Sequence, residues 1–331
     1  MGAHFSSQLT QFFPPKPTFT EENVSDLSGK VYLVTGANTG IGKQLARLLY
    51  SKNGKVYLAC RSESKATDAI EDIKKSHPSS TGSLVFLQFD LNDLAAVKAA
   101  AEKFLATETK LHVLFNNAGV QNSNNPPKTV QGYDHHMGIN TLAPFLFTKL
   151  LTPLLKSTVA AAPAGLVRVV WVSSQGNELS ALNSVGLDME NLDYNKKNED
   201  DLTEYAFSKV GNWMHGVQYG KLHKADGIIS ISLNPGNITS DLYRENKRLP
   251  IRMAIALLGH PEINGAYTEL YAGVSPDITI EKTGGWVIPF GRLAAIRKDL
   301  LAATKSPEEG GNGTVAKFWE WSEEQVKPFA S

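Results

Sequence analysis

A tyrosine followed four positions later by a lysine is the pattern in this chain best suited to chemistry. A phenol has an unperturbed pKa near 10, so it exchanges protons near neutral pH only where a cation stabilises its phenolate. Residues four apart on a helix share a face, so the lysine can supply that cation. Such a pair could protonate the oxygen of a carbonyl group during reduction, or deprotonate an alcohol in the reverse direction.

Two pairs match this pattern, Tyr205/Lys209 and Tyr243/Lys247. The chain has ten tyrosines, and with lysine at about 7% of residues roughly one match is expected by chance. Tyr205 lies in a segment of helical character between two predicted strands, whereas Tyr243 lies in an irregular stretch after the Asn234-Pro235-Gly236 motif. We therefore predict that Tyr205 and Lys209 form the catalytic pair.

Glycines form a second pattern near the start of the regular part of the chain. They lie between a predicted strand at residues 31–34 and a predicted helix at residues 41–50. Glycines at such a turn let the backbone approach a pyrophosphate, which binds the free N–H groups at the helix N-terminus. The sequence predicts a dinucleotide site that includes Gly36, Asn38, Thr39, Gly40, Ile41 and Gly42.

The end of the second predicted strand should select between NAD and NADP. Proteins that bind NAD place an acidic residue about 20 positions after the glycine turn, where it contacts the ribose hydroxyl. Here Cys60 is followed by Arg61 and Ser62, with Arg61 19 positions after Gly42. A guanidinium suits a 2′-phosphate, with Ser62 as a neighbouring donor, so we predict NADP(H) as the cofactor. The alternative is that Arg61 is only a surface loop residue.

Short apolar runs alternate with longer segments of helical period from Gly29 onward. Runs that are apolar throughout are buried on both faces, which indicates a parallel sheet covered by helices. We expect one α/β domain of the Rossmann type over residues 29–331, with a doubly wound parallel sheet and helices on both faces, after an irregular N-terminal arm over residues 1–28. Strands are expected at residues 31–34, 56–60, 84–89, 113–115, 167–172, 228–233 and 286–288.

The composition argues against several functional classes. Lysines and arginines number 33, as do aspartates and glutamates, so no global charge draws the chain to nucleic acid or an anionic membrane. We expect no transmembrane segment and no secretory signal, because no long apolar run is present. The single cysteine excludes an intrachain disulfide and favours the cytosol. Residues 1–6 fit the pattern for N-myristoylation.

Two adjacent histidines, His135 and His136, invite comparison with a metal site. Adjacent side chains on a helix point apart, and no thiolate or further histidine cluster is near in the sequence. We expect a structural or surface role for both and no bound metal.

Together these patterns resemble the short-chain dehydrogenase/reductases, over roughly residues 28–300. The sequence near the end of the chain, including Trp286-Val287-Ile288-Pro289, is similar to that of the retinol-dehydrogenase-like reductases. The similarity is greatest to the soluble fungal members, several of which serve secondary metabolism. Beside the glycine turn and the tyrosine–lysine pair, the resemblance rests on Asp90-Leu91, Asn116-Asn117-Ala118-Gly119, Asn140, Val172-Ser173-Ser174, and Asn234-Pro235-Gly236 followed by Ser240.

The resemblance implies a role for each of these residues. Tyr205 would be the general acid/base, and Lys209 would lower its pKa and bind the nicotinamide ribose. Ser174 would hold the substrate oxygen, with Ser173 as the alternative, and Asn140 would support a water in the proton relay. The further cofactor contacts would come from Asp90, Leu91, Asn117, Ala118, Gly119, Pro235, Gly236, Ile238 and Ser240.

Two segments are expected to shape the substrate pocket. Ser174 and Tyr205 stand 31 positions apart (205 − 174), farther than in many members of the family, so the polar segment at residues 188–204 is predicted to be a loop at the pocket rim. Residues 237–262 are predicted to form a mobile apolar lid over a hydrophobic substrate, carrying Met253 and Leu257 among others. A buried helix that never meets ligand is the alternative for this second segment.

The sequence thus predicts an NADPH-dependent oxidoreductase that transfers a hydride between nicotinamide and the carbonyl or alcohol carbon of a small hydrophobic substrate, such as a secondary metabolite. One alternative is a family member recruited to cyclisation or isomerisation. Another is a dinucleotide-sensing protein that has lost its catalysis. The resemblance also implies a homodimer or homotetramer.

Overall fold

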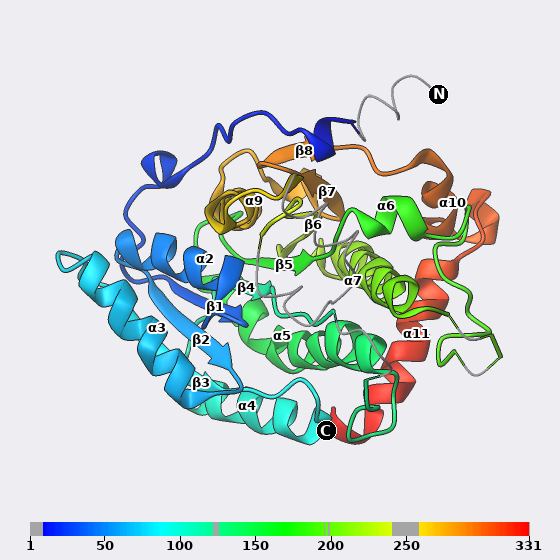
Figure 1. Ribbon diagram of the computed structural model, residues 1–331, viewed down its shortest axis with the longest axis horizontal. Helices are drawn as coiled ribbons and strands as arrows, with labels where there is room; N and C mark the ends of the chain where they lie inside the picture. Colours follow the sequence, from blue (N-terminus) through cyan, green and yellow to red (C-terminus); the bar gives the residue numbers. More distant parts are fainter. Residues whose placement is uncertain (1–8, 122–125, 195, 198, 240–257, 331) are drawn as a thin grey trace.

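A central sheet of eight strands organises the protein (Figure 1). The computed structural model describes residues 9–121, 126–194, 196–197, 199–239 and 258–330. The strand order is β3-β2-β1-β4-β5-β6-β7-β8, parallel from β3 to β7, with β8 antiparallel at the edge. The strands are β1 (Val31–Thr35), β2 (Lys55–Cys60), β3 (Ser83–Gln88), β4 (Val113–Asn116), β5 (Arg168–Val172), β6 (Ile229–Leu233), β7 (Gly285–Ile288) and β8 (Arg292–Ala294).

Helices cover both faces of this sheet. One apolar core lies under α2 (Gly40–Ser51), α3 (Glu63–Ser76) and α9 (Glu262–Val274). The opposite core lies under α4 (Leu94–Thr107), α5 (Ala143–Ala161) and α7 (Asp201–His223). Three further helices pack against α7, namely α6 (Gly176–Ser180), α10 (Leu301–Thr304) and α11 (Thr314–Val326).

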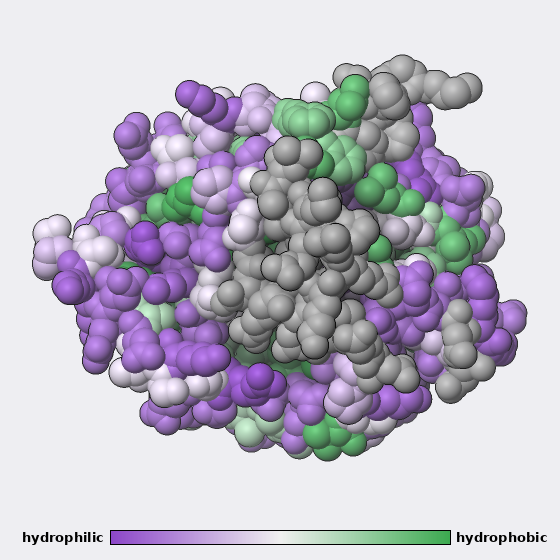
Figure 2. All heavy atoms as spheres, viewed as in Figure 1, coloured by the Kyte–Doolittle hydropathy of each residue, from purple (hydrophilic) through white to green (hydrophobic). Residues whose placement is uncertain are grey.

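The predicted doubly wound parallel sheet with helices on both faces is confirmed. Each of the seven predicted strands is present, with ends within one residue of the prediction. The sequence did not reveal β8, which has only three residues, or the π-helical segment Met137–Leu142 that precedes α5. Among the described residues, the surface seen in Figure 2 is mostly hydrophilic, especially over α3 and α4, with scattered apolar residues.

One helical stretch, Met137–Ala161, is long and apolar enough to cross a membrane. Of its most apolar window, 78% is buried inside the protein, between the sheet and the neighbouring helices. A helix buried in a protein core can also be this long and this apolar, so burial explains the composition of the stretch.

The described part of the N-terminal arm packs along the domain. Phe19 meets Tyr271 of α9 edge to face, with ring centres 5.7 Å apart, and Val24 and Leu27 are buried in the first core. Residues 9–12 form a helical turn, and a short 3₁₀ helix (Glu21–Asn23) begins at a capping box on Thr20, so the prediction of an irregular arm is wrong for these residues. Residues 1–8, with the myristoylation pattern, lie outside the described residues, as do residues 240–257 with Ser240, the Tyr243/Lys247 pair, Met253 and Leu257 of the predicted lid.

Candidate dinucleotide and catalytic site

The strand order reverses between β1 and β4, where ligands bind at the carboxyl ends of open parallel sheets. A cavity of about 240 Å³ lies at this point. The loops after β1, β4, β5 and β6 all contribute to it, together with α7. Its lining is Gly36, Asn38, Thr39, Gly40, Ile41, Gly42, Asn117, Ala118, Gly119, Val172, Ser173, Tyr205, Lys209 and Pro235.

The glycine turn needs glycine at three of its positions. Gly36 and Gly40 have φ of +69° and +59°, in the left-handed region that favours glycine. A Cβ on Gly42 would stand 2.5 Å from Asn117 Nδ2 and 2.7 Å from the carbonyl oxygen of Gly36. Because α2 begins at Gly40, its first N–H groups have no partner within the helix and lie at this turn. The turn therefore fits a pyrophosphate held by backbone donors.

Thr35 joins this turn to the loop after β4. Its hydroxyl donates to the carbonyl oxygen of Phe115 at 3.2 Å and accepts from the N–H of Ala118 at 2.9 Å. The amide of Asn117 donates to the carbonyl oxygen of Thr35 at 2.6 Å. Asn117 thus joins the loop after β4 to the end of β1 in the wall of the cavity. The cofactor contact that the resemblance implies for Asn117 stays a prediction.

The residues predicted to select the coenzyme lie at the end of β2. Arg61 is exposed, and Ser62 begins α3 by accepting a hydrogen bond from Lys65 N at 3.4 Å. Cys60 is buried with its thiol near the backbone N–H groups of Ala37 and Asn38, and burial raises its pKa to about 12. A neutral thiol therefore stands where NAD-binding proteins carry a carboxylate.

Several other predicted cofactor residues are not among those that line the cavity. Asp90 follows β3 and accepts from Asn92 N at 3.0 Å, and Leu91 packs on the second core. Ile238 is buried, and both Ile238 and Ile41 lie against Gly265 of α9. Gly236 has φ of +100°. Contact of these residues with a cofactor stays a prediction.

Tyr205 and Lys209 lie in the first half of α7, which Asp200 caps by accepting from Leu202 N and Thr203 N. The ammonium nitrogen of Lys209 lies 5.9 Å from the centre of the Tyr205 ring and donates to the carbonyl oxygen of Val172 at 3.0 Å. Burial lowers the pKa of Lys209 to about 8, opposed by the charge of Glu269. The structure thus places a cation beside the phenol, as the spacing predicts.

The two serines after β5 have different surroundings. Ser173 is buried, and its hydroxyl donates to the carbonyl oxygen of Lys209 at 2.6 Å. The hydroxyl of Ser174 is partly exposed and accepts from Gly176 N at 3.2 Å. A Cβ on Gly176 would stand 3.3 Å from Ala206 and 3.6 Å from the Ser174 hydroxyl, so Ser174 is near the residue after Tyr205. Ser173 ties the end of β5 to α7 and also lines the glycine-turn cavity, whereas Ser174 is not among the lining residues. The assignment of Ser174 to the substrate oxygen, with Ser173 as the alternative, stays a prediction.

Asn140 is fully buried in the π-helical segment Met137–Leu142. Its Oδ1 accepts from Val120 N at 2.8 Å, and its Nδ2 donates to the carbonyl oxygen of Val120 at 3.0 Å and to the Ser208 hydroxyl at 2.9 Å. The side chain therefore ties the loop after β4 to α7. Support of a relay water by Asn140 stays a prediction.

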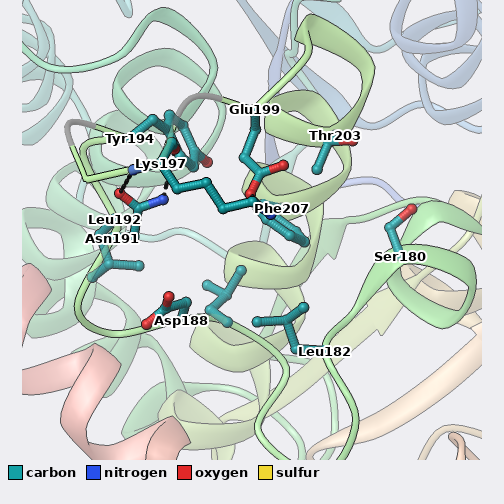
Figure 3. A pocket seen from close by; sticks show the side chains of 11 residues that line it. Ser180, Leu182, Asp188, Asn191, Leu192, Tyr194, Lys197, Glu199, Thr203 and Phe207 are labelled. Carbon is teal, nitrogen blue, oxygen red and sulfur yellow. Dashed lines mark hydrogen bonds and ion pairs between the residues drawn. The ribbon is translucent and has the colours of Figure 1, made fainter.

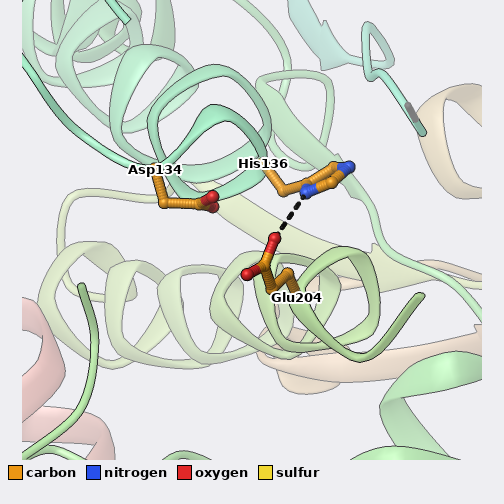
Figure 4. Close-up of side chains that lie close together, drawn as sticks. All are labelled: Asp134, His136 and Glu204. Carbon is orange, nitrogen blue, oxygen red and sulfur yellow. Dashed lines mark ion pairs between the residues drawn. The ribbon is translucent and has the colours of Figure 1, made fainter. Parts of the chain in front are cut away.

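His136 is a neighbour of Tyr205 that sequence reasoning missed. Its buried ring lies edge to face with the Tyr205 ring, with centres 6.2 Å apart, and its Nδ1 is 3.6 Å from Oε2 of Glu204 (Figure 4). Asp134, His136 and Glu204 each offer one atom that could bind a metal ion, and these three atoms lie within 4.8 Å of one another. The Oδ1 of Asp134 also accepts from Met137 N at 2.8 Å. His135 Nδ1 lies 3.0 Å from the carbonyl oxygen of Pro127, but its ring stays edge to face with the His136 ring, with centres 5.9 Å apart, so the two side chains do not point apart as expected.

The segment between Ser174 and Tyr205 forms the wall of a second pocket, of about 370 Å³ (Figure 3). Apolar side chains such as Tyr194 and Phe207 face polar ones, including a Lys197–Glu199 ion pair of 2.7 Å. This pocket shares no lining residue with the glycine-turn cavity. The last four residues of the predicted loop, 201–204, are instead the first turn of α7, because the Asp200 cap starts the helix there.

Comparison with known proteins agrees with this geometry. A family model described as short chain dehydrogenase matches residues 30–184. A short-chain dehydrogenase/reductase of Neocamarosporium betae is 49% identical over 98% of this chain and 94% of its own length. Another from Phomopsis amygdali is 50% identical over 96% of both chains.

Solved structures share the fold at lower identity. An NADPH-bound carbonyl reductase from chicken fatty liver is 21% identical, with a TM-score of 0.57 over 80% of this chain and 96% of that one. A 3-ketoacyl-(acyl-carrier-protein) reductase from Brucella melitensis complexed with NADH is 22% identical, with a TM-score of 0.59 over 81% of this chain and 99% of that one. The fold, the motifs and the near full-length fungal relatives together show that this chain belongs to the short-chain dehydrogenase/reductase family of oxidoreductases.

Proposed function

We propose that the protein is an NADPH-dependent oxidoreductase that transfers a hydride between nicotinamide and the carbonyl or alcohol carbon of a small hydrophobic substrate. One observation carries the proposal. Tyr205 and Lys209 line the same cavity as the glycine turn, with the ammonium 5.9 Å from the ring centre. Proton transfer and dinucleotide binding would therefore take place side by side.

The residues around the cavity fit a dinucleotide. The Gly36–Gly42 turn would hold the pyrophosphate, and the exposed Arg61 with Ser62 would hold a 2′-phosphate. When bound, the nicotinamide supplies or accepts the hydride. The remaining contacts would come from Asp90, Leu91, Asn117, Ala118, Gly119, Lys209, Pro235, Gly236, Ile238 and Ser240.

Tyr205 would donate its phenolic proton to the substrate oxygen during reduction, and take it back during oxidation. The Lys209 ammonium would stabilise the phenolate left behind, because an opposite charge nearby favours the ionised form. Ser174 would hold the substrate oxygen toward the phenol. Asn140 would keep the loop after β4 against α7 and support a relay water.

The substrate class rests on the chain beyond the described residues. Residues 242–258 carry many apolar side chains, which favours a hydrophobic substrate, as in secondary metabolism. We also propose a cytosolic location, supported by the single cysteine, Cys60, which allows no intrachain disulfide. A homodimer or homotetramer is proposed from the family alone.

Incubation of the pure protein with NADPH and a panel of ketones and aldehydes tests the proposal. Stoichiometric loss of NADPH together with alcohol formation is the expected result. Product formation without net NADPH loss would support a cyclase or isomerase instead. Tight NADPH binding without turnover across the panel would favour a sensing protein.

A further inference from the structure

We propose that Gln11 in the N-terminal arm positions the Pro235–Gly236 turn at the edge of the proposed cofactor site. This inference rests on the proposed function for its effect on cofactor binding. Gln11 is fully buried although it lies in a segment that the sequence marks as irregular. Its side chain reaches the carboxyl end of β6, 223 positions later in the chain.

Gln11 is linked to this turn through one side chain. The amide Nδ2 of Asn234 donates to Gln11 Oε1 at 2.9 Å. On its other side, Asn234 Oδ1 accepts from Gly236 N at 3.0 Å. Gly236 has φ of +100°, and Pro235 lines the glycine-turn cavity. The arm therefore holds, through Asn234, the backbone that forms one wall of the site.

The other end of the Gln11 side chain is also fixed. Gln11 Nε2 donates to Oε2 of Glu178 at 3.2 Å, and Trp286 Nε1 donates to Oε1 of the same buried carboxylate at 2.8 Å. The backbone next to Gln11 is anchored as well, because Arg292 Nη2 donates to the carbonyl oxygen of Thr10 at 2.7 Å. Gln11 thus bridges α6 and the end of β6, and Glu178 links it in turn to Trp286 of β7.

Only a group that both donates and accepts can make this bridge. Asn234 Nδ2 needs an acceptor, since its Oδ1 is taken by Gly236, while Glu178 offers only acceptors when ionised. Removing the amide leaves buried polar atoms without partners, which disfavours the observed arrangement. If the turn then spends less time in this arrangement, cofactor affinity falls by the same factor.

The test compares three variants of the full chain. Gln11→Ala removes the bridge. Gln11→Glu keeps the shape, and its protonated carboxyl again offers one donor and one acceptor. Phe13→Ala is the matched control, because Phe13 is 66% exposed two positions farther along the arm. NADPH dissociation constants are measured by nicotinamide fluorescence from about pH 5.5 to about pH 8, a range that brackets carboxyl groups with raised pKa.

We expect Gln11→Ala to weaken NADPH binding about tenfold, equal to about 1.4 kcal/mol, with a higher KM for NADPH and little change in kcat. Gln11→Glu should match the wild type at the acidic end and approach Gln11→Ala at the alkaline end, where a second carboxylate faces Glu178. Phe13→Ala should bind as the wild type does. Equal affinity in all four proteins, or a loss in Gln11→Glu that does not change with pH, would overturn the positioning role.

Amide hydrogen exchange in the absence of cofactor separates this inference from the proposed function. Faster exchange at residues 234–238 in Gln11→Ala than in Phe13→Ala supports the positioning role. Equal exchange in the two variants refutes it, whether or not cofactor binds. A wild-type protein that binds neither NADPH nor NADH would refute the proposed function alone, and the exchange comparison would still decide the role of Gln11.

Discussion

Lys209 directs its ammonium group to the carbonyl oxygen of Val172 at 3.0 Å while standing 5.9 Å from the centre of the Tyr205 ring. The hydrogen bond anchors the lysine to the end of β5, so the cation does not depend on the phenol for its position. A cation held in this way lowers the cost of a phenolate at Tyr205. Proton transfer should therefore depend on both side chains.

Tyr205→Phe removes the proton donor and keeps the ring. Turnover should fall by about two to four orders of magnitude, the usual contribution of a positioned acid/base. NADPH affinity should stay close to that of the wild type. Tyr243→Phe, in the second Tyr-x₃-Lys match, is the control and should be nearly silent. Steady-state kinetics and NADPH titration decide, and the reverse pattern would mean that the wrong pair was chosen.

Glu269 should make stability depend on pH. Neither of its buried carboxyl oxygens has a hydrogen-bond partner among the described residues, and burial raises its pKa from 4.5 to about 8, with Lys209 opposing. Between these values the unfolded chain loses this proton and the folded protein keeps it, so the residue costs stability as pH rises from 4.5 to about 8.

Glu269→Gln should therefore gain stability over the wild type across that window, by on the order of a few kcal/mol at about 1.4 kcal/mol per pH unit, and level off above it. Urea unfolding at several pH values measures the difference. Glu71→Gln, at an exposed glutamate of α3, is the control for loss of a glutamate charge. A constant difference for Glu269→Gln from acid to neutral pH would contradict the raised pKa.

Coenzyme choice should depend on Arg61. A charge-assisted contact with the 2′-phosphate contributes about 1.5–3 kcal/mol, so NADPH should be preferred by roughly ten- to a hundredfold. Arg61→Ala should remove most of this preference, and Cys60→Asp combined with Arg61→Ala should turn it toward NADH. Lys65, in the next helix, adds positive charge near the end of β2, so a partial loss of the NADPH preference in Arg61→Ala also agrees with this prediction. Values of kcat/KM for both coenzymes test this, and equal wild-type values would show that Arg61 does not select.

Gly42→Ala should disrupt the dinucleotide site. The new methyl group would stand 2.7 Å from the carbonyl oxygen of Gly36, so the turn must shift. We expect NADPH affinity to fall about tenfold or more, since each decade is about 1.4 kcal/mol. Gly29→Ala is the control, because its Cβ meets nothing within 4 Å, although its φ of +75° makes alanine strained. Unchanged NADPH binding in Gly42→Ala would argue against a pyrophosphate at this turn.

The sheet could be predicted from sequence because its strands are apolar on both faces. Strands such as β1 and β5 are buried at every position, which leaves a continuous apolar run in the sequence. The short edge strand β8 has no such run, since its three residues are half-buried or exposed. The glycine turn and the tyrosine–lysine pair were predictable because both patterns are local.

The contacts that sequence reasoning missed are long-range. Gln11 meets Asn234 across 223 positions, and His136 meets Tyr205 from a different helix. No spacing rule connects such residues, because tertiary packing alone brings them together. A buried polar side chain in an arm whose sequence has no helical or strand period carries no signal in a single sequence, whereas its hydrogen bonds identify it at once in the structure.

Transfer of a labelled hydride tests the central claim most directly. The wild-type protein is given NADPH with deuterium at both hydrogen positions of the reactive nicotinamide carbon, together with a ketone that it consumes, and the alcohol formed is examined by mass spectrometry. The account predicts one deuterium on the alcohol carbon for each NADPH oxidised, and almost no labelled alcohol from Tyr205→Phe. Product that carries no deuterium would contradict hydride transfer at this site.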